Sequence, residues 1–187
     1  MTKENLRLLM KEARDKEASA LVPFVDDSTQ SDPDRWSAKD NLAHLTAWRL
    51  LAAAEIDAVR TGVGSPSITA ETQQQHNTRV YEATRDQPAA SVRKAADRSW
   101  NKLAAAVEAC SEEDLEKPRL RRPEQKTWQM IPGNTYFHLT QHLGWWNTER
   151  GDEVAAEDAA RWAHDVATTS FPEERWCQAD SPRLTHS

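Results

Sequence analysis

Apolar residues recur at intervals of three and four through every long segment of this chain, and prolines and glycines separate these segments. Such intervals place the apolar side chains on one face of an α-helix, whereas a half-buried β-strand would alternate apolar and polar residues. No segment shows that alternation. The clearest helical pattern follows Ser37, with apolar residues at Leu42, Leu45, Trp48, Ala52, Ile56 and Val59. The sequence therefore predicts an all-α fold.

Capping and chain-breaking residues predict where each helix begins and ends. Ser37 and Asp40 have the spacing of a capping box at the start of one helix, and Gly62 marks its end. Pro23 and Pro88 end or interrupt other helical segments, because proline disfavours the helical conformation in the residue before it. The expected helices span about residues 3–21, 38–62, 69–85, 89–109, 134–151 and 152–167, with a short turn after Ser111.

These helices predict a four-helix bundle with additional short helices and a C-terminal extension. Residues 116–133 contain three prolines and are expected to form a loop, and residues 171–187 are expected to be an irregular tail. A length of 187 residues suits one domain, which we place at residues 1–170. Only 38% of the residues are apolar, but eight tryptophans supply large apolar surfaces for a core.

Charge and cysteine content narrow the classes of partner. The net charge is −6, from 24 basic and 30 acidic residues, and such a surface repels nucleic-acid phosphates. We interpret the basic run at Arg119, Arg121 and Arg122 as a solvated loop. No apolar run approaches the ~20 residues that span a bilayer, and the N-terminus lacks the apolar core of a signal peptide. Cys110 and Cys177 match neither a metal-binding spacing nor a disulfide framework. We therefore expect a cytoplasmic protein without a nucleic-acid or membrane partner.

Three histidines are the strongest candidates for chemistry. His138 and His142 are four residues apart, so their rings lie on one side of a helix, one turn apart, at the border of its apolar stripe. Such a pair can offer two nitrogens to one metal ion, and His44, at the margin of the apolar face of the second long helix, can offer a third. Three imidazoles would leave coordination positions open, as in catalytic zinc sites. The spacing fits equally well with hydrogen-bonded histidines in a bundle core. The other histidines, His76, His164 and His186, are expected at the surface.

Aromatic residues beside these histidines predict the walls of a pocket. Trp48, Trp145 and Trp146 suit a flat, partly apolar small molecule, although Trp48 and Trp146 also lie on apolar stripes that a bundle would bury. Tyr81 and Glu55 are candidates for polar groups of the pocket, and either could equally lie at the surface.

Four segments resemble the DinB-like (YfiT-like) helical-bundle superfamily. Residues 36–48, WSAKDNLAHLTAW, resemble its second-helix signature, and residues 133–142 resemble its last-helix H-x-x-x-H signature. Residues 77–82, NTRVYE, and 111–115, SEEDL, are similar to the ClbS/DfsB branch of that superfamily. The similarity covers roughly residues 3–150. It implies a four-helix bundle with a pocket between the helices and a divalent metal, zinc or nickel, bound by His44, His138 and His142.

The resemblance also implies a function. The ClbS/DfsB branch is associated with self-protection against the genotoxin colibactin and with hydrolytic opening of an electrophilic cyclopropane. We therefore expect a small-molecule resistance or detoxification protein, with hydrolysis of a strained electrophilic ring as the leading activity. The alternatives are a metal-dependent thiol transferase or isomerase and a protein that sequesters a compound without turnover. The expected partner is a small-molecule ligand or substrate, and a homodimer remains open.

Overall fold

The computed structural model describes residues 1–26, 35–64 and 73–170. Its long helices are α1 (Lys3–Ala20), α2 (Ala38–Thr61), α4 (Ala89–Ala109), α7 (Tyr136–Glu149) and α8 (Glu153–Ser170). The shorter elements are η1 (Val22–Phe24), α3 (Gln73–Thr84), α5 (Glu112–Glu116), η3 (Thr127–Gln129) and α6 (Met130–Asn134). These ranges contain no β-strand, which confirms the predicted all-α fold. Within them, no helix has both the length and the apolar character needed to cross a membrane.

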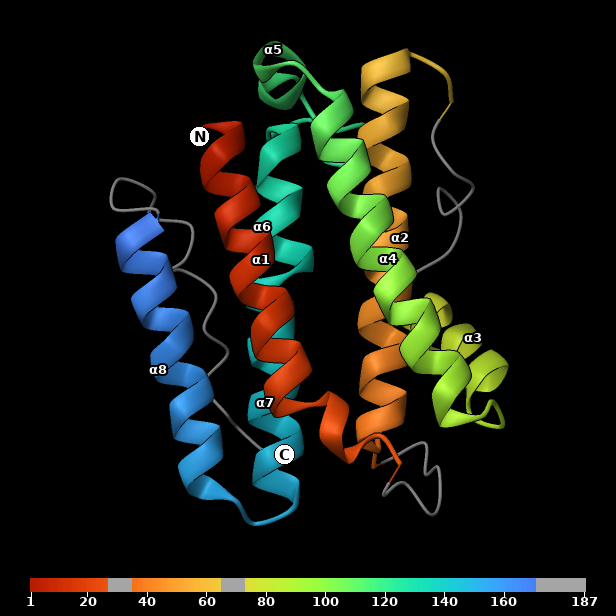
Figure 1. Cartoon of the computed structure of the whole chain (residues 1–187). Helices are drawn as coiled ribbons and strands as arrows, with labels where there is room; N and C mark the ends of the chain where they lie inside the picture. Colours follow the sequence, from red (N-terminus) through yellow and green to blue (C-terminus); the bar gives the residue numbers. More distant parts are fainter. Residues whose placement is uncertain (27–34, 65–72, 171–187) are drawn as a thin grey trace.

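The long helices run side by side along the length of the molecule (Figure 1). α2 packs closely against α4, while α1 contacts α4, α6 and α7. The short α6 stands in line with α7, so that the two form one column of the bundle (Figure 1). α8 packs along α7 at the outer edge and also contacts α1, and α3 packs against α2. This arrangement agrees with the predicted four-helix bundle with short additions.

Local hydrogen bonds explain why two of the long helices begin where they do. The Thr2 side chain accepts a hydrogen bond from the Asn5 backbone N–H at the start of α1. At the start of α2, the Ser37 hydroxyl accepts from the Asp40 N–H, and the Asp40 carboxylate accepts from the Ser37 N–H, which completes the predicted capping box. Gly62 ends α2 with φ of 70°, a left-handed conformation that a residue without Cβ adopts with little strain.

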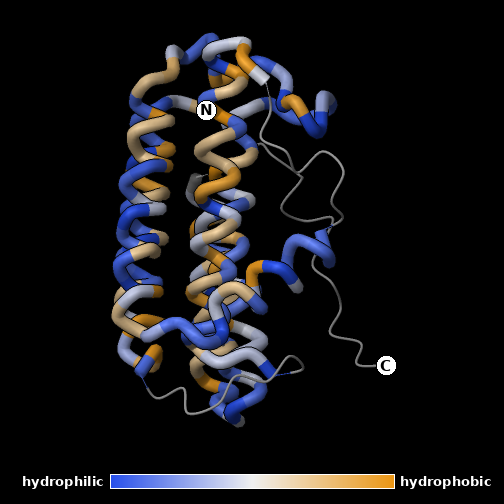
Figure 2. Tube along the Cα trace, turned by 90° about the vertical axis from the view of Figure 1, so that its right-hand side faces the viewer, coloured by the Kyte–Doolittle hydropathy of each residue, from blue (hydrophilic) through white to orange (hydrophobic). Residues whose placement is uncertain are grey.

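The core consists of two clusters of buried apolar residues. One cluster includes Ile56 of α2, Leu103 of α4 and Ile131 of α6, and the other includes Leu42 of α2 and Leu139 of α7. Figure 2 shows hydrophobic and hydrophilic residues mixed along each long helix, as expected for helices that bury one face and expose the other. The two clusters together hold α1, α2, α4 and α7 against one another.

A buried ion pair joins α1 to α2 beside α4. The side chains of Arg49 and Glu17 are only 1% and 3% exposed, and Arg49 Nη1 donates to Glu17 Oε2 at 2.5 Å. Arg49 Nε also donates to Ser99 Oγ at 2.9 Å, and Trp100 Nε1 donates to Glu17 Oε1 at 2.8 Å. The guanidinium lies 4.3 Å from the centroid of the Trp100 ring. Both charges therefore have partners, which is the condition under which a charged pair can be buried.

The segment 116–133, predicted as a loop, contains two short helical elements, η3 and α6, so this prediction was wrong in part. Pro132 is the third residue of α6, where its missing N–H removes no helical hydrogen bond. Arg119, predicted to be solvated, has a side chain only 14% exposed and pairs with the buried Glu55 at 3.2 Å. This ion pair holds the loop against α2, and Arg119 also donates to Gln125 within the loop.

Other helix boundaries differ from the predicted ones by a few residues. α1 ends one residue earlier, at Ala20, α7 begins at Tyr136 and ends at Glu149, and α8 continues to Ser170. Several predictions concern residues outside the described ranges: the start of the third helix at residues 69–72, the tail at residues 171–187, Cys177 and His186.

Candidate metal centre

His44 of α2 meets His138 and His142 of α7 between the two helices. His138 Nε2 lies 3.0 Å from His44 Nε2 and 3.2 Å from His142 Nε2. Each ring offers one nitrogen to a group whose members all lie within 4.8 Å of one another. His44 and His142 are buried, and His138 is half-buried. The structure thus brings together the three histidines that the sequence singled out.

Hydrogen bonding among these rings does not satisfy both short contacts well. A neutral imidazole nitrogen carries either one N–H donor or one lone pair. A single N–H or lone pair on His138 Nε2 can point well at only one of its two neighbours, so the other contact is poorly aligned or, if His138 Nε2 is unprotonated, joins its lone pair to that of His142. A cation shared by the lone pairs of the three nitrogens removes this conflict. Donors ~2.1 Å from one zinc ion lie ~3.0–3.4 Å apart in octahedral or tetrahedral arrangements, which matches both short contacts.

Asn41, one turn before His44, fixes the tautomer of His142. Its side-chain NH₂ donates to the backbone carbonyl oxygens of Ser37 at 2.9 Å and Trp36 at 3.3 Å. The Asn41 amide oxygen therefore faces His142 Nδ1 at 2.6 Å and accepts its proton. This bond leaves the Nε2 lone pair of His142 directed at the other two rings. Such an outer hydrogen bond is a regular feature of metal-binding histidines.

Burial keeps the three imidazoles neutral. It lowers the pKa of His44 to about 2, with smaller contributions from His142 and His76. Burial also holds the pKa of His138 and His142 well below the usual range, assisted by neighbouring imidazoles and, for His138, by the Arg49 guanidinium. Neutral rings have free lone pairs at physiological pH, so protons do not compete with a metal ion for them. The residues present therefore fit a divalent cation that accepts nitrogen ligands.

A cavity of about 320 Å³ opens beside the imidazoles. Its volume lies near the lower end of the range of small-molecule pockets. Among its lining residues Glu149 is the only carboxylate, and none is lysine or arginine. The lining consists of Trp36, Asn41, His44, Gln73, Asn77, His138, Gln141, His142, Trp145 and Glu149. The cavity thus combines two indole rings, several amides and the candidate metal-binding nitrogens.

The predicted aromatic residues occupy different places around this cavity. Trp145 lines it, and its ring meets that of His142 edge-on at 5.2 Å between centroids. Trp48 lies behind the histidines, 6.2 Å from the His44 ring, and its Nε1 donates to Asn77 Oδ1 at 3.1 Å. Tyr81 stacks on Trp36 at 6.2 Å and supports the wall from outside.

Two further candidates lie apart from the cavity lining. Trp146 belongs to the second core cluster and packs on Phe24 at 5.0 Å, with the Arg150 guanidinium over its ring. Glu55 is engaged by Arg119 on the loop before η3. The structure therefore assigns both residues to packing and ion pairing.

Several residues of this site were not predicted from the sequence. Trp36 stacks on the His142 ring with 6.0 Å between centroids, and the Asn41 side-chain oxygen accepts a hydrogen bond from His142 Nδ1. His76 was predicted at the surface, but it is buried, 4% exposed, against Trp48 at 4.8 Å. The error arose because α3 has few apolar residues, and only Val80 and Tyr81, about one turn after His76, indicate its buried face. The i+4 spacing of Gln141, Trp145 and Glu149 was visible in the sequence and could have revealed the lining face of α7.

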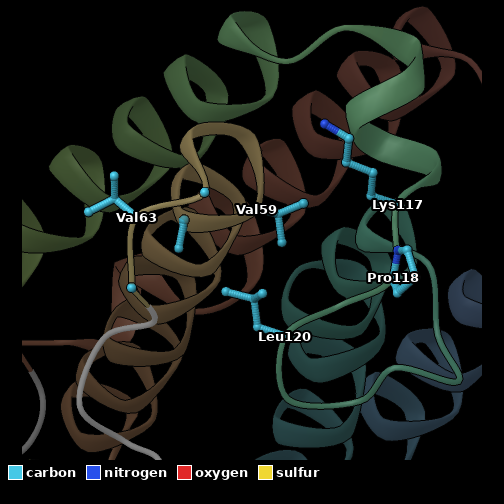
Figure 3. Close-up of a pocket in the computed structure, with 8 residues that line it drawn as sticks. Val59, Val63, Lys117, Pro118 and Leu120 are labelled. Carbon is cyan, nitrogen blue, oxygen red and sulfur yellow. The ribbon is translucent and has the colours of Figure 1, made fainter.

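A second hollow, of about 390 Å³, lies near the other end of α2 (Figure 3). Its nearest α2 residue is fourteen positions beyond His44, about 20 Å along the helix. Among the described residues that line it, Lys117 alone is ionisable, and its ammonium group already pairs with Asp114 at 2.6 Å. The lining comprises Ala58, Val59, Gly62, Val63, Gly64, Lys117, Pro118 and Leu120. This apolar hollow offers no set of converging reactive groups.

Comparison with protein families gives one match. The model of the DinB superfamily matches residues 16–146, a range that includes all three histidines and ends before α8. No curated protein and no solved structure matches the chain.

Proposed function

Because the chain belongs to the DinB superfamily, we propose that His44, His138 and His142 bind one divalent metal ion in a small-molecule detoxification enzyme. The observation that carries this proposal is the convergence of three neutral imidazoles, with His138 Nε2 3.0 Å from His44 Nε2 and 3.2 Å from His142 Nε2. The cavity beside these nitrogens supports the proposal further, because it gives a small molecule access to them. Zinc and nickel are the metals we propose, since both accept imidazole ligands.

The reaction we propose is hydrolytic opening of a strained electrophilic ring. The resemblance of residues 77–82 and 111–115 to the ClbS/DfsB branch supports this substrate class. In such a reaction the oxygen of water bonds to a ring carbon, the adjacent ring bond breaks, and the atom that receives its electron pair takes up a proton. When bound, a divalent ion supplies Lewis acidity, which lowers the pKa of coordinated water. We further propose that this activity is cytoplasmic, on the basis of the cysteine content.

The side chains of the chain have separate tasks in this proposal. Asn41 holds His142 in the tautomer that presents Nε2. Trp145 binds a flat molecule by stacking, and Trp36, packed against Tyr81 and His142, limits the access of bulk water. Asn77 uses its carbonyl oxygen to accept from Trp48, so its NH₂ group remains to donate to a polar atom of the substrate. Gln141 lies next to His142 on the lining and can donate to oxygen charge that develops as the ring opens.

Metal content and turnover test the proposal together. Full-length protein without a histidine tag should contain one divalent ion per chain by elemental mass spectrometry. It should open rings in a panel of epoxides and cyclopropanes, followed by mass spectrometry of the products. His138→Ala should abolish turnover and lower metal content while the helical circular dichroism remains. His164→Ala is the matched control, because His164 is an exposed histidine on α8.

The alternatives give different results in the same experiment. Turnover that requires an added low-molecular-weight thiol would assign the protein to thiol transfer or isomerisation. Stoichiometric binding without turnover would assign it to sequestration. Protein that binds no divalent ion, with His138→Ala unchanged in protection and turnover, would overturn the metal-dependent function.

A further inference from the structure

One face of α7 connects the candidate metal centre to a carboxylate. His138, His142, Trp145 and Glu149 follow at intervals of four, three and four residues, which places them on the same side of the helix, and all four line the cavity. The seven residues from His142 to Glu149 correspond to about 10 Å along the helix axis. A molecule of the size of two fused rings can therefore reach from the imidazoles to Glu149.

The indole of Trp145 is available to a ligand. Trp145 is 44% exposed although it lines the cavity, and among the described residues its one aromatic contact is with His142. The neighbouring Trp146 differs, because the Arg150 guanidinium lies 4.2 Å from its ring centroid. Among the described residues no lysine or arginine covers Trp145 in this way. An exposed indole face attracts cations through the negative charge of its π-system.

The carboxylate of Glu149 has no ion-pair partner within the described ranges. Arg35 is close, but its Nη2 donates to the Glu149 backbone carbonyl at 2.7 Å and not to the carboxylate. The segments that precede Trp36 and Gln73, residues 27–34 and 65–72, contain no lysine or arginine in the sequence. The described lining residues therefore include one carboxylate, that of Glu149, and no lysine or arginine.

We infer that this cavity selects a planar molecule with a cationic nitrogen, which binds between Trp145 and Glu149 while the rest of the molecule extends toward the three histidines. This inference rests on the proposed function and names its substrate class. A protonated amine or amidine gains attraction from the indole face and charge-assisted hydrogen bonds from the carboxylate. An anionic molecule of the same shape meets the Glu149 charge without a lysine or arginine on the lining. Selection against anions also disfavours thiol cofactors that carry carboxylates.

Three probes of the same ring size and different charge test this inference. 2-Naphthylmethylamine is the cation, 2-naphthoate the anion and 2-naphthalenemethanol the neutral reference. Their affinities for the full-length protein should be measured by isothermal titration calorimetry, first after removal of metal by a chelator and then with added zinc. The metal-free measurement is the decisive one, because a divalent ion would itself attract the anion.

The cation should bind metal-free protein more tightly than the neutral probe, and the anion more weakly. Glu149→Gln keeps the size of the side chain and removes its charge, so it should lower the affinity for the cation about threefold to fivefold. Trp145→Leu should weaken the cation more than the neutral probe. Glu157→Gln, an exposed change on α8, is the matched control and should alter none of the affinities.

The outcomes separate this inference from the proposed function. Equal or tighter binding of the anion by metal-free protein, or a preference for the cation that Glu149→Gln leaves unchanged, would overturn the inference even if the protein binds zinc and turns over. Loss of zinc binding and turnover with the charge preference intact would overturn the proposed function alone.

Discussion

Replacement of Asn41 by leucine tests whether the hydrogen bond to His142 prepares that ring for a metal ion. The side chain is 4% exposed, its oxygen accepts from His142 Nδ1 at 2.6 Å, and its NH₂ group donates to two backbone carbonyls before α2. Leucine has nearly the same shape but removes all three bonds. His142 then keeps a buried N–H without an acceptor and can adopt the tautomer that directs its proton at the other imidazoles.

The size of the effect follows from these bonds. Loss of an outer hydrogen bond to a metal-binding histidine lowers metal affinity about 10-fold to 100-fold. A buried donor without a partner costs about 1–3 kcal/mol of folding free energy, so Asn41→Leu should also be less stable than the wild type. Asn41→Asp keeps an acceptor for His142 and should retain zinc affinity within a few-fold of the wild type.

Competition with a chromophoric chelator measures the zinc affinity, and urea unfolding followed by circular dichroism measures the stability. Asn101→Leu, an exposed substitution on α4, is the control and should leave the zinc affinity unchanged. If Asn41→Leu binds zinc as tightly as the wild type while His138→Ala does not, the assigned role of Asn41 in orienting His142 is wrong.

Two further predictions concern stability. Arg49→Met should lower the free energy of unfolding by about 3–5 kcal/mol in urea titrations, because it leaves the Glu17 carboxylate buried beside Trp100 without its cation. The double variant Glu17→Met/Arg49→Met should recover most of this loss, and a double variant as unstable as the single one would contradict the explanation. Metal-free protein should lose stability as the pH falls below about 6.5, because the pKa of His44 is about 2 in the folded chain and unfolded histidine binds a proton near pH 6.5. Below that pH the unfolded state binds more protons than the native state. The free energy of unfolding therefore falls by ~1.4 kcal/mol per pH unit for each such histidine. His44→Gln should therefore show a shallower pH dependence, and equal slopes for variant and wild type would refute this assignment.

Sequence patterns predicted those parts of the fold whose causes are local. The capping box at Ser37 and the left-handed Gly62 depend on neighbours within a few residues, so the bounds of α2 followed from the sequence. The segment 116–133 was predicted as a loop, but its structure depends on contacts with residues far away in the sequence. Arg119 pairs with Glu55, 64 residues earlier, and no local pattern reveals such a partner. The buried pair of Glu17 and Arg49 was missed for the same reason.

Local spacing also predicted part of the site, and the rest depends on contacts between helices. His138 and His142 share one helix, so their spacing alone placed them side by side. The approach of His44 depends on how α2 packs against α7, so its position on α2 made it only a candidate, which the family resemblance then supported. The surface assignment of His76 failed because α3 has a polar sequence and is buried through its contact with Trp48. The spacing along α7 also places Glu149 one turn after Trp145, on the face that lines the cavity, and this could have been predicted from the sequence.

The charges around the histidines connect the two proposals. Arg49 is already compensated by Glu17, and the three imidazoles are neutral, so the charge of a divalent ion at the centre would have no carboxylate ligand to offset it. A centre of this kind attracts electron-rich atoms strongly, because neutral ligands leave the full positive charge of the ion acting on the open positions. The carboxylate of Glu149, about 10 Å farther along α7, attracts cationic groups instead. A substrate that satisfies both ends is dipolar: its electron-rich, reacting group lies toward the histidines and its cationic nitrogen toward Glu149. If both proposals hold, the order of residues along one helix face therefore fixes the orientation of the molecule in the cavity.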